Sequence, residues 1–281
     1  PGGGFVVAWE SQNGDESGWG VISQRFSADG KKRGSETLVN KTELNDQRNP
    51  SITVLTNGDY LITYQGYNHE DGEGTDIYAR RFDSAGNASE DEIRLNETKS
   101  SSQEYPALAA LKDGGFIATW QTHSGDGSSW GIAAQRFDQA GNAVGEETIV
   151  NTYTTGEQRA AKVTELNDGS YVMVWQSLNQ DRDNWGIFGQ HLNADGSKRG
   201  TEFKINTHES GAQQAPQITA KVNGEYVVSW ESHNQDGNNY GIYAQQFDQN
   251  SSKVGKEIRV NTYTSQSQSQ VDINGYGEKL H

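Results

Sequence analysis

The chain has 281 residues, a formal net charge of −15 at pH 7 and no cysteine. The lack of cysteine excludes disulfides and thiolate metal sites, and the acidic balance argues against a nucleic-acid ligand, whose phosphates attract lysine and arginine. No apolar run approaches the roughly 18–20 residues of a membrane span, so membrane insertion is not expected.

One stretch, a polar loop followed by a strand-like run, occurs five times. The copies occupy residues 13–27, 70–83, 124–138, 179–193 and 234–248. Each follows an apolar run that ends in an aromatic residue, at Trp9, Tyr64, Trp120, Trp175 or Trp230, in steps of 55, 56, 55 and 55. A period this regular predicts a repeat architecture in which neighbouring copies share their core.

Within each repeat, apolar alternation and turn residues predict four strands. In the second repeat they span residues 50–55, 60–65, 76–83 and 92–96, and the stretch to residue 105 crosses to the next repeat. Residues 56–59 (TNGD) and 84–87 (SAGN) supply tight turns. Four antiparallel strands in about 55 residues are typical of a propeller blade.

The two ends of the chain hold incomplete repeats. A glutamine precedes each first strand, at Gln47, Gln103, Gln158, Gln213 and Gln268. The last of these introduces residues 270–273, which lack a second strand, while residues 5–9 lack a first strand. The sequence therefore predicts an all-β, five-bladed β-propeller with four antiparallel strands per blade. The N- and C-terminal strands share one blade and close the ring. One monomeric domain is expected over residues 1–276, and residues 277–281 are interpreted as an appended tail.

In such a fold the loops between second and third strands share one face with the crossovers between blades. An acid recurs in these loops, at Asp15, Asp71, Asp126, Asp181 and Asp236, and four residues later stand Trp19, Thr75, Trp130, Trp185 and Tyr240. The crossovers begin with Asn40, Asn96, Asn151, Asn206 and Asn261, each seven residues before its glutamine. A glutamate stands four residues before each asparagine, at Glu36, Glu92, Glu147, Glu202 and Glu257.

Aromatic faces beside carboxylates and amides suit sugar recognition, at shallow sites that multivalency strengthens. The candidate ligand-binding residues are Asp15, Trp19, Asp126, Trp130, Asp181, Trp185, Asp236, Tyr240, Gln47, Gln103, Gln158, Gln213 and Gln268. In the alternative, the acids hold the loops through Asx-turns and the tryptophans belong to the core. The second repeat has Thr75–Asp76 where the others have an aromatic residue and glycine, so its pocket is expected not to bind.

Calcium is a possible cofactor of the same loops. Alternating oxygen ligands occur at Asn179, Asp181 and Asp183, and at Asn234, Asp236 and Asn238. The alternative is a solvated acidic loop. The loops also resemble the Asp-box of sialidase-type propellers, whose role is structural.

Residues 120–152 and 230–262 carry most of the repeat pattern W-[QE]-S-x-N-x-D-G-x-x-W-G-I-x-A-Q-R-F-D. This pattern resembles modules of large secreted bacterial RTX-type adhesins, and the five-bladed plan is similar to tachylectin-type lectins. The resemblance implies display at a bacterial cell surface and a glycan or cell-surface ligand, plausibly with Ca²⁺. We therefore predict a multivalent, lectin-like module of a secreted adhesin and no enzymatic activity.

Two alternatives stay open: a protein- or peptide-binding spacer, and a five-bladed glycoside hydrolase. A hydrolase needs blades that differ where the chemistry happens, whereas these repeats agree at their polar positions. The histidines, at His69, His123, His191, His208 and His233, occur in only some repeats and are interpreted as surface-loop residues.

Overall fold

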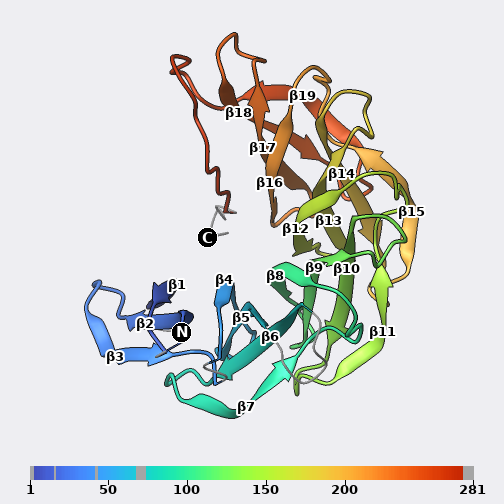
Figure 1. Ribbon diagram of the computed structural model, residues 1–281. Helices are drawn as coiled ribbons and strands as arrows, with labels where there is room; N and C mark the ends of the chain where they lie inside the picture. Colours follow the sequence, from blue (N-terminus) through green and yellow to red (C-terminus); the bar gives the residue numbers. More distant parts are fainter. Residues whose placement is uncertain (1–2, 16, 42–43, 68–73, 275–281) are drawn as a thin grey trace. The chain divides into compact units, whose positions relative to one another are not determined.

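The computed structural model describes residues 3–15, 17–41, 44–67 and 74–274, and every regular element within them is a β-strand (Figure 1). The strands form five antiparallel sheets in chain order, one with three strands and four with four. The predicted all-β class and the five repeating sheets are thus confirmed. None of the described residues forms a helix that could span a membrane.

We number the sheets 1 to 5 along the chain. Sheet 1 contains β1 (Phe5–Gln12), β2 (Trp19–Phe26) and β3 (Lys32–Leu38). Sheet 2 contains β4 (Gln47–Val54), β5 (Tyr60–Tyr67), β6 (Thr75–Phe82) and β7 (Ala88–Arg94). Sheet 3 contains β8 (Gln103–Ala110), β9 (Phe116–His123), β10 (Trp130–Phe137) and β11 (Ala143–Ile149). Sheet 4 contains β12 (Gln158–Glu165), β13 (Tyr171–Leu178), β14 (Trp185–Leu192) and β15 (Lys198–Lys204). Sheet 5 contains β16 (Gln213–Ala220), β17 (Tyr226–His233), β18 (Tyr240–Phe247) and β19 (Lys253–Arg259).

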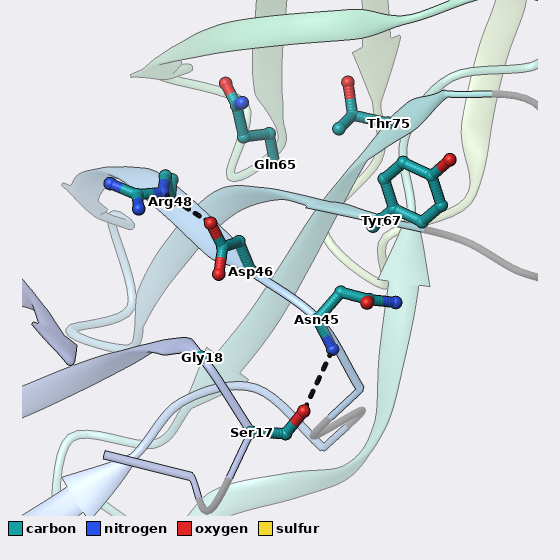
Figure 2. Close-up of a pocket in the computed structure, with 8 residues that line it drawn as sticks. All are labelled: Ser17, Gly18, Asn45, Asp46, Arg48, Gln65, Tyr67 and Thr75. Atoms are coloured by element: carbon teal, nitrogen blue, oxygen red, sulfur yellow. Dashed lines mark hydrogen bonds and ion pairs between the residues drawn. The ribbon is translucent and has the colours of Figure 1, made fainter. Parts of the chain in front are cut away.

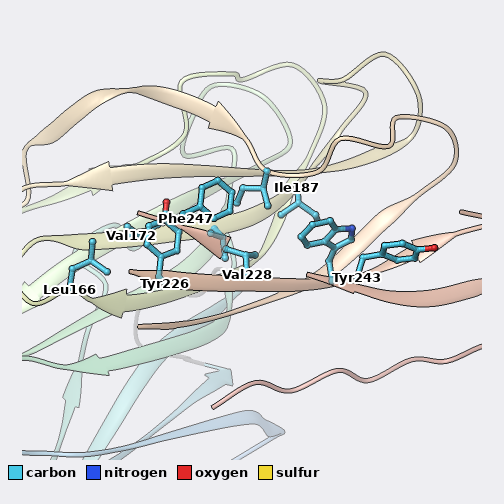
Figure 3. Packing of buried hydrophobic residues seen from close by; sticks show 10 residues of the cluster. Leu166, Val172, Ile187, Tyr226, Val228, Tyr243 and Phe247 are labelled. Carbon is cyan, nitrogen blue, oxygen red and sulfur yellow. The ribbon is translucent and has the colours of Figure 1, made fainter. Parts of the chain in front are cut away.

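The chain divides into two compact units, which are described separately. One comprises Pro1–Thr122 with Ala134–Thr148, and the other His123–Ala133 with Ile149–His281. In the first, Val21 and Val39 of sheet 1 pack with Tyr60, Tyr64 and Phe82 of sheet 2. In the second, sheets 4 and 5 share a core that includes Val172, Ile187, Trp230 and Phe247 (Figure 3). Sheets 1 and 2, and likewise sheets 4 and 5, therefore share a core, as the short repeat requires.

The first strands of sheets 2, 3 and 5 carry a bulge that the preceding sheet stabilises. Asn49, Tyr105 and Ala215 adopt φ values of 54°, 53° and 52°, which are unfavourable for residues other than glycine. The side chain after each aromatic anchor accepts the bulge N–H: Glu10 Oε1 from Asn49 (2.7 Å), Gln65 Oε1 from Tyr105 (3.0 Å) and Gln176 Oε1 from Ala215 (2.9 Å). These bonds fix the point where one sheet meets the next.

Two features of the chain differ from the sequence prediction. The fourth strand of sheet 2 covers Ala88–Arg94 rather than residues 92–96, because it pairs with β6 directly after the turn. Residues 270–273 are not assigned to a strand, and sheet 1 has three strands. Within residues 270–274, the N–H groups of Gln270 and Ile273 donate to carboxylates of Glu231 and Asp272 instead of to a strand partner. Residues 277–281 lie outside the described residues, and the single-domain prediction stays a prediction.

Candidate functional site

The recurring loop acids face the crossovers rather than the solvent. Asn40 Nδ2 donates to Asp15 Oδ2 at 2.8 Å, and Asn206 Nδ2 donates to Asp181 Oδ2 at 3.1 Å. The equivalent bond joins Asn151 to Asp126 (2.8 Å) and Asn261 to Asp236 (3.1 Å). Asp15 and Asp181 are buried, and burial raises the pKa of Asp181. These contacts match the alternative in which the acids hold the loops, so a ligand role for the acids stays a prediction.

The asparagine–glutamine pairs satisfy the backbone of the crossovers. In sheet 4, Asn206 Oδ1 accepts the N–H of Ile187 at 2.8 Å, and Asn206 Nδ2 donates to Gln213 Oε1 at 3.0 Å. Gln213 Nε2 donates to the carbonyls of Ser210 and Gly211, both at 3.2 Å. The other predicted glutamines occupy the equivalent positions of their repeats. Gln47, Gln103 and Gln158 are buried, and Gln268 is half-buried. Their amides lie inside the crossovers.

In the second repeat, the carboxylate that contacts the crossover asparagine comes from a strand residue instead of a loop residue. A Cβ built on Gly131 would lie 2.8 Å from Asp126 Cγ, so glycine leaves room there for the loop carboxylate. In sheet 2 this glycine is replaced by Asp76, which is buried and whose Oδ1 accepts from Asn96 Nδ2 at 2.7 Å. The strand itself thus carries the carboxylate that the loop supplies elsewhere. Asp71 and His69 lie outside the described residues.

The loop aromatics are half-buried at the starts of the third strands. Arg48 Cζ lies 4.4 Å from the ring centroid of Trp19, and Arg159 Cζ lies 5.3 Å from that of Trp130. These guanidinium groups cover ring faces on which a sugar would stack. Trp185 and Tyr240 are also half-buried, and Tyr240 Oη donates to Gln214 Oε1 at 3.4 Å.

The predicted calcium residues point in different directions. Asp181 is directed inward to Asn206, whereas Asp183 Oδ2 accepts the N–H of Gly211 at 3.0 Å. Asp236 Oδ1 accepts the backbone N–H of Asn238 at 3.4 Å. Asn179 and Asn234 occupy left-handed turn positions, with φ of 60° and 59°. In the described part of the chain, no three carboxylate or histidine side chains gather as a metal site, and calcium in these loops stays a prediction.

A pocket of about 560 Å³ lies between sheets 1 and 2 (Figure 2). It is lined by Ser17, Gly18, Asn45, Asp46, Arg48, Gln65, Tyr67 and Thr75. The lining comes from the loop between β1 and β2, the crossover between sheets 1 and 2, and strands β4, β5 and β6 of sheet 2. The pocket therefore lies on the face that the sequence analysis selected, with a different set of residues.

Arg48 organises the charges of this pocket. Its Nε donates to Asp46 Oδ2 at 3.1 Å, and its Nη1 lies 3.4 Å from Glu10 Oε2. Asp46 Oδ1 also accepts the N–H of Trp19 at 3.2 Å. The Asp46 side chain is 49% exposed, so it is held in place and still accessible. The guanidinium of Arg48 thus contacts two carboxylates, so Arg48, Asp46 and Glu10 together carry a net negative charge.

A third carboxylate lies on the next first strand. Gln65, in the pocket wall, accepts from Asn49 Nδ2 at 2.8 Å and from the N–H of Tyr105 at 3.0 Å. Glu104 precedes Tyr105 on β8, and Gln121 Nε2 donates to Glu104 Oε2 at 3.4 Å. Tyr67 and Tyr105 are 41% and 49% exposed and present aromatic surface in this region.

The other repeats match these acids to different degrees. Asp46 has an acidic equivalent in Glu157, whose Oε2 lies 2.9 Å from Arg159 Nε, and Glu10 has one in Glu231. Positions equivalent to Glu104 hold Arg48, Arg159 and Gln214, and positions equivalent to Glu10 hold Gln65, Gln121, Gln176 and Glu231. Sequence reasoning missed Glu10, Asp46 and Glu104 because it searched for agreement between repeats. The signal that could have identified the pocket is a combination of residues, because Glu10 and Asp46 are the one pair of acids that stands at these positions beside an arginine.

No protein-family model matches the chain, and no curated protein matches it. Solved structures of similar fold do match. The endo-arabinase of Bacteroides thetaiotaomicron is 13% identical, with a TM-score of 0.51 over 93% of this chain and 91% of its own. The alpha-L-arabinanase of Penicillium chrysogenum, solved with arabinobiose, is 18% identical, with a TM-score of 0.55 over 76% of this chain and 66% of its own. The endo-arabinanase of Bacillus licheniformis is 15% identical, with a TM-score of 0.50 over 91% of this chain and 94% of its own.

This likeness supports the five-bladed β-propeller class and corrects the functional prediction. The neighbours are named as arabinases and arabinanases, which contradicts the prediction of a lectin-like adhesin module without enzymatic activity and favours its glycoside hydrolase alternative. The polar residues on which that prediction rested hold the crossovers, whereas other residues line the pocket. RTX-type membership and an extracellular location stay predictions. At these identities the fold alone is shared.

Proposed function

We propose that the chain is a glycoside hydrolase that acts at the pocket between sheets 1 and 2. The observation that carries this proposal is the pocket itself, whose wall holds Asp46 beside Arg48, with Glu10 at 3.4 Å from the same guanidinium. Glu104 precedes Tyr105, whose N–H donates to Gln65 in the pocket wall. Glycoside hydrolysis needs a pair of carboxylates, one to protonate the leaving oxygen and one to act as base or nucleophile. The neighbours' arabinan substrates make arabinans the first substrates to test.

The contacts suggest how the carboxylates divide these roles. Asp46 accepts from Arg48 Nε and from the N–H of Trp19, and these two bonds hold its carboxylate in the pocket wall. We assign Asp46 as base or nucleophile and Glu104 as acid. Glu10 contacts Arg48 and the N–H of Asn49 and is assigned as a positioning residue. Tyr67 offers an exposed ring against which a sugar can stack.

The test is release of reducing ends from a panel of neutral polysaccharides that includes linear and branched arabinan. Wild type should hydrolyse at least one of them, and Asp46→Asn should lower kcat by about 10²–10⁴-fold with an unchanged Tm. Glu10→Gln should shift KM and kcat less than Asp46→Asn, because Gln65 and Gln176 already make the same backbone bond in other repeats. Failure to cleave any polysaccharide, or full activity in Asp46→Asn, would refute the proposal.

We also propose that residues 270–273 complete sheet 1 as its fourth strand and close the ring. This is supported by exposed apolar residues at both ends. Val260 is 54% exposed, whereas its equivalents in the other repeats (Val39, Leu95, Val150 and Ile205) are 0–1% exposed. Phe5 and Val7 on β1 are 50% and 42% exposed.

The register of β4 with β5, in which Ile52 lies opposite Ile62, pairs Ile273 with Val7 by equivalence. The chain has no cysteine, so Val7→Cys with Ile273→Cys should form a single intramolecular disulfide on oxidation. A reduced monomer after oxidation, or crosslinked dimers alone, would contradict ring closure.

A further inference from the structure

A cavity of about 330 Å³ lies between sheets 1 and 2, at the opposite end of β5 from the proposed hydrolase pocket. Tyr60, at the start of β5, lines this cavity, whereas Tyr67, at the end of the strand, lines the hydrolase pocket. The cavity wall also contains Arg25 and Arg33, which lie directly opposite each other on β2 and β3. Like charges in this arrangement destabilise a sheet, so the pair of arginines favours a negative partner.

In the other four sheets, a carboxylate from the turn before the second strand contacts one member of the equivalent pair of residues. Arg81, the equivalent of Arg25, donates through Nε and Nη2 to Asp59 Oδ2, at 3.0 and 2.7 Å. In sheets 3, 4 and 5 the contacts are Arg136 with Asp113, Arg199 with Asp168, and Gln246 with Glu225. Each acid stands one or three residues before the second strand. The repeat therefore places a carboxylate at this end of the sheet.

Sheet 1 lacks this acid. The residues one and three positions before β1 are Gly4 and Gly2. A Cβ built on Gly4 would lie 2.5 Å from the carbonyl oxygen of Phe26, so the backbone there leaves no room for a side chain. Asp83, in the turn next to the cavity, accepts from the N–H and from Nδ2 of Asn87 at 2.8 and 2.7 Å and so holds its own turn. The arginines of sheet 1 thus have no carboxylate from the turn that supplies one elsewhere.

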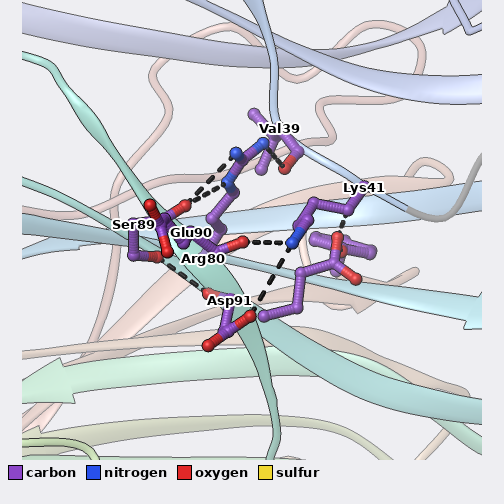
Figure 4. Close-up of polar contacts among 8 residues, drawn as sticks. Val39, Lys41, Arg80, Ser89, Glu90 and Asp91 are labelled. Atoms are coloured by element: carbon purple, nitrogen blue, oxygen red, sulfur yellow. Dashed lines mark hydrogen bonds and ion pairs between the residues drawn. The ribbon is translucent and has the colours of Figure 1, made fainter.

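The two arginines keep hydrogen-bond donors available to a ligand. Arg25 donates through its Nη atoms to the carbonyls of residues 84 and 85, and its Nε has no partner among the described residues. Arg33 makes no side-chain hydrogen bond or ion pair within the part of the chain that the structure describes. Arg80 differs, because its guanidinium donates to carbonyls on both sides of the junction between sheets 1 and 2 (Figure 4).

A buried phenol adds a further donor to the cavity. Tyr60 is 4% exposed and its hydroxyl donates to no described residue, whereas the equivalent Tyr171 donates to a backbone carbonyl at 2.6 Å. Burial raises the pKa of Tyr60 and the charge of Arg25 opposes this shift, so the phenol keeps its proton close to a guanidinium. The ring of Phe5 is 50% exposed and stacks on Phe26, with 4.8 Å between the centroids. An apolar face therefore adjoins the donors.

We propose that this cavity binds the carboxylate of a small organic acid, of about the size of one uronic acid unit. The carboxylate takes the place of the acidic side chain that the other sheets carry, and it accepts from Arg33, from Arg25 Nε and from the Tyr60 hydroxyl. Guanidinium groups match the geometry of a carboxylate, and the carbon body of the acid lies against the exposed ring of Phe5. The cavity is separate from the pocket that contains Asp46, so the inference does not depend on hydrolase activity.

The test is titration calorimetry of the full chain with sodium glucuronate at low ionic strength, beside glucose and sodium sulfate. We expect saturable binding of glucuronate, weakened about 10–100-fold in Arg33→Val and about threefold to tenfold in Tyr60→Phe. Sheets 3 and 5 carry valine at the position of Arg33, and Phe116 stands at the position of Tyr60 in sheet 3, so both variants should fold. Glucose should show no saturable binding, because it lacks the carboxylate.

Arg199→Val is the matched control, because Arg199 occupies the position of Arg33 in sheet 4 and is already paired with Asp168. This variant should bind glucuronate as wild type does. Asp46→Asn should do so as well, which separates this site from the hydrolase pocket. No saturable binding of glucuronate, or equal affinities of wild type and Arg33→Val, would overturn the proposal. Sulfate binding as tight as that of glucuronate would also overturn it, because the site would then recognise charge alone.

Discussion

Asn206→Ala tests whether the repeated polar residues are structural. Asn206 is fully buried; its Nδ2 donates to Asp181 Oδ2 (3.1 Å), the His208 carbonyl (2.7 Å) and Gln213 Oε1 (3.0 Å), and its Oδ1 accepts from the Ile187 N–H (2.8 Å). Alanine leaves at least the N–H and the carboxylate buried without this partner. At about 1–3 kcal/mol for each stranded group, the free energy of unfolding should fall by about 3–5 kcal/mol. The Tm should fall by about 10 °C.

The assay is thermal and urea unfolding beside a matched control. Asn193→Ala removes an asparagine from the same sheet whose Nδ2 makes one exposed bond, to Ser197 Oγ at 3.0 Å. The control should lose less than about 1 kcal/mol. If Asn206→Ala unfolds within about 1 °C of wild type, the structural interpretation of the asparagine–glutamine pairs is wrong.

Two further predictions concern the second unit. His191 is buried between the hydroxyls of Ser170 (2.8 Å) and Ser251 (3.1 Å). Burial is the main cause that lowers its pKa below 6.5. The positive charge of Arg199 lowers it further, and Asp168 has the opposite effect. The neutral form is thus favoured in the folded chain, so stability should be full above about pH 6.5 and decline as pH falls toward the folded pKa. His191→Gln, the residue type found at the equivalent Gln246, should flatten the Tm profile between about pH 5 and 7; an unchanged slope would place the titration elsewhere. Gly186→Ala would put a Cβ 2.3 Å from Asp181 Oδ2 and should destabilise by about 1–3 kcal/mol in urea unfolding, whereas wild-type stability would show that the loop yields freely.

Much of the fold could be predicted from the sequence because every repeat buries the same kinds of side chain at the same positions. The glutamines that were expected to introduce first strands begin those strands, at Gln47, Gln103, Gln158 and Gln213. Four of the five aromatic anchors are buried, with Trp120, Trp175 and Trp230 at 0% exposure, and Trp9 is half-buried. Periodicity reports such features directly, since each copy must bury the same side chain against its neighbour.

The site could not be found in the same way. Carboxylates and amides that would suit a sugar also suit a buried backbone, and their agreement between repeats does not separate the two roles. Asp76 shows the difficulty. It stands at a different position of the repeat from Asp126, yet it makes the same kind of contact with its crossover asparagine. The pair of Asp46 and Arg48 recurs as Glu157 and Arg159, so periodicity alone does not distinguish the pocket; its second carboxylate at the arginine, Glu10, comes from the neighbouring sheet.

The measurement that tests the central claim most directly is the rate of arabinan hydrolysis by Glu104→Gln compared with Glu231→Gln. Both changes introduce a residue that another repeat already carries at the same position, Gln214 in one case and Gln176 in the other, so both variants should fold. We predict that Glu104→Gln loses activity by about 10²–10⁴-fold while Glu231→Gln retains it. Equal rates in the two variants, or hydrolysis that depends on Glu231 instead, would contradict the assignment of the site to the pocket between sheets 1 and 2.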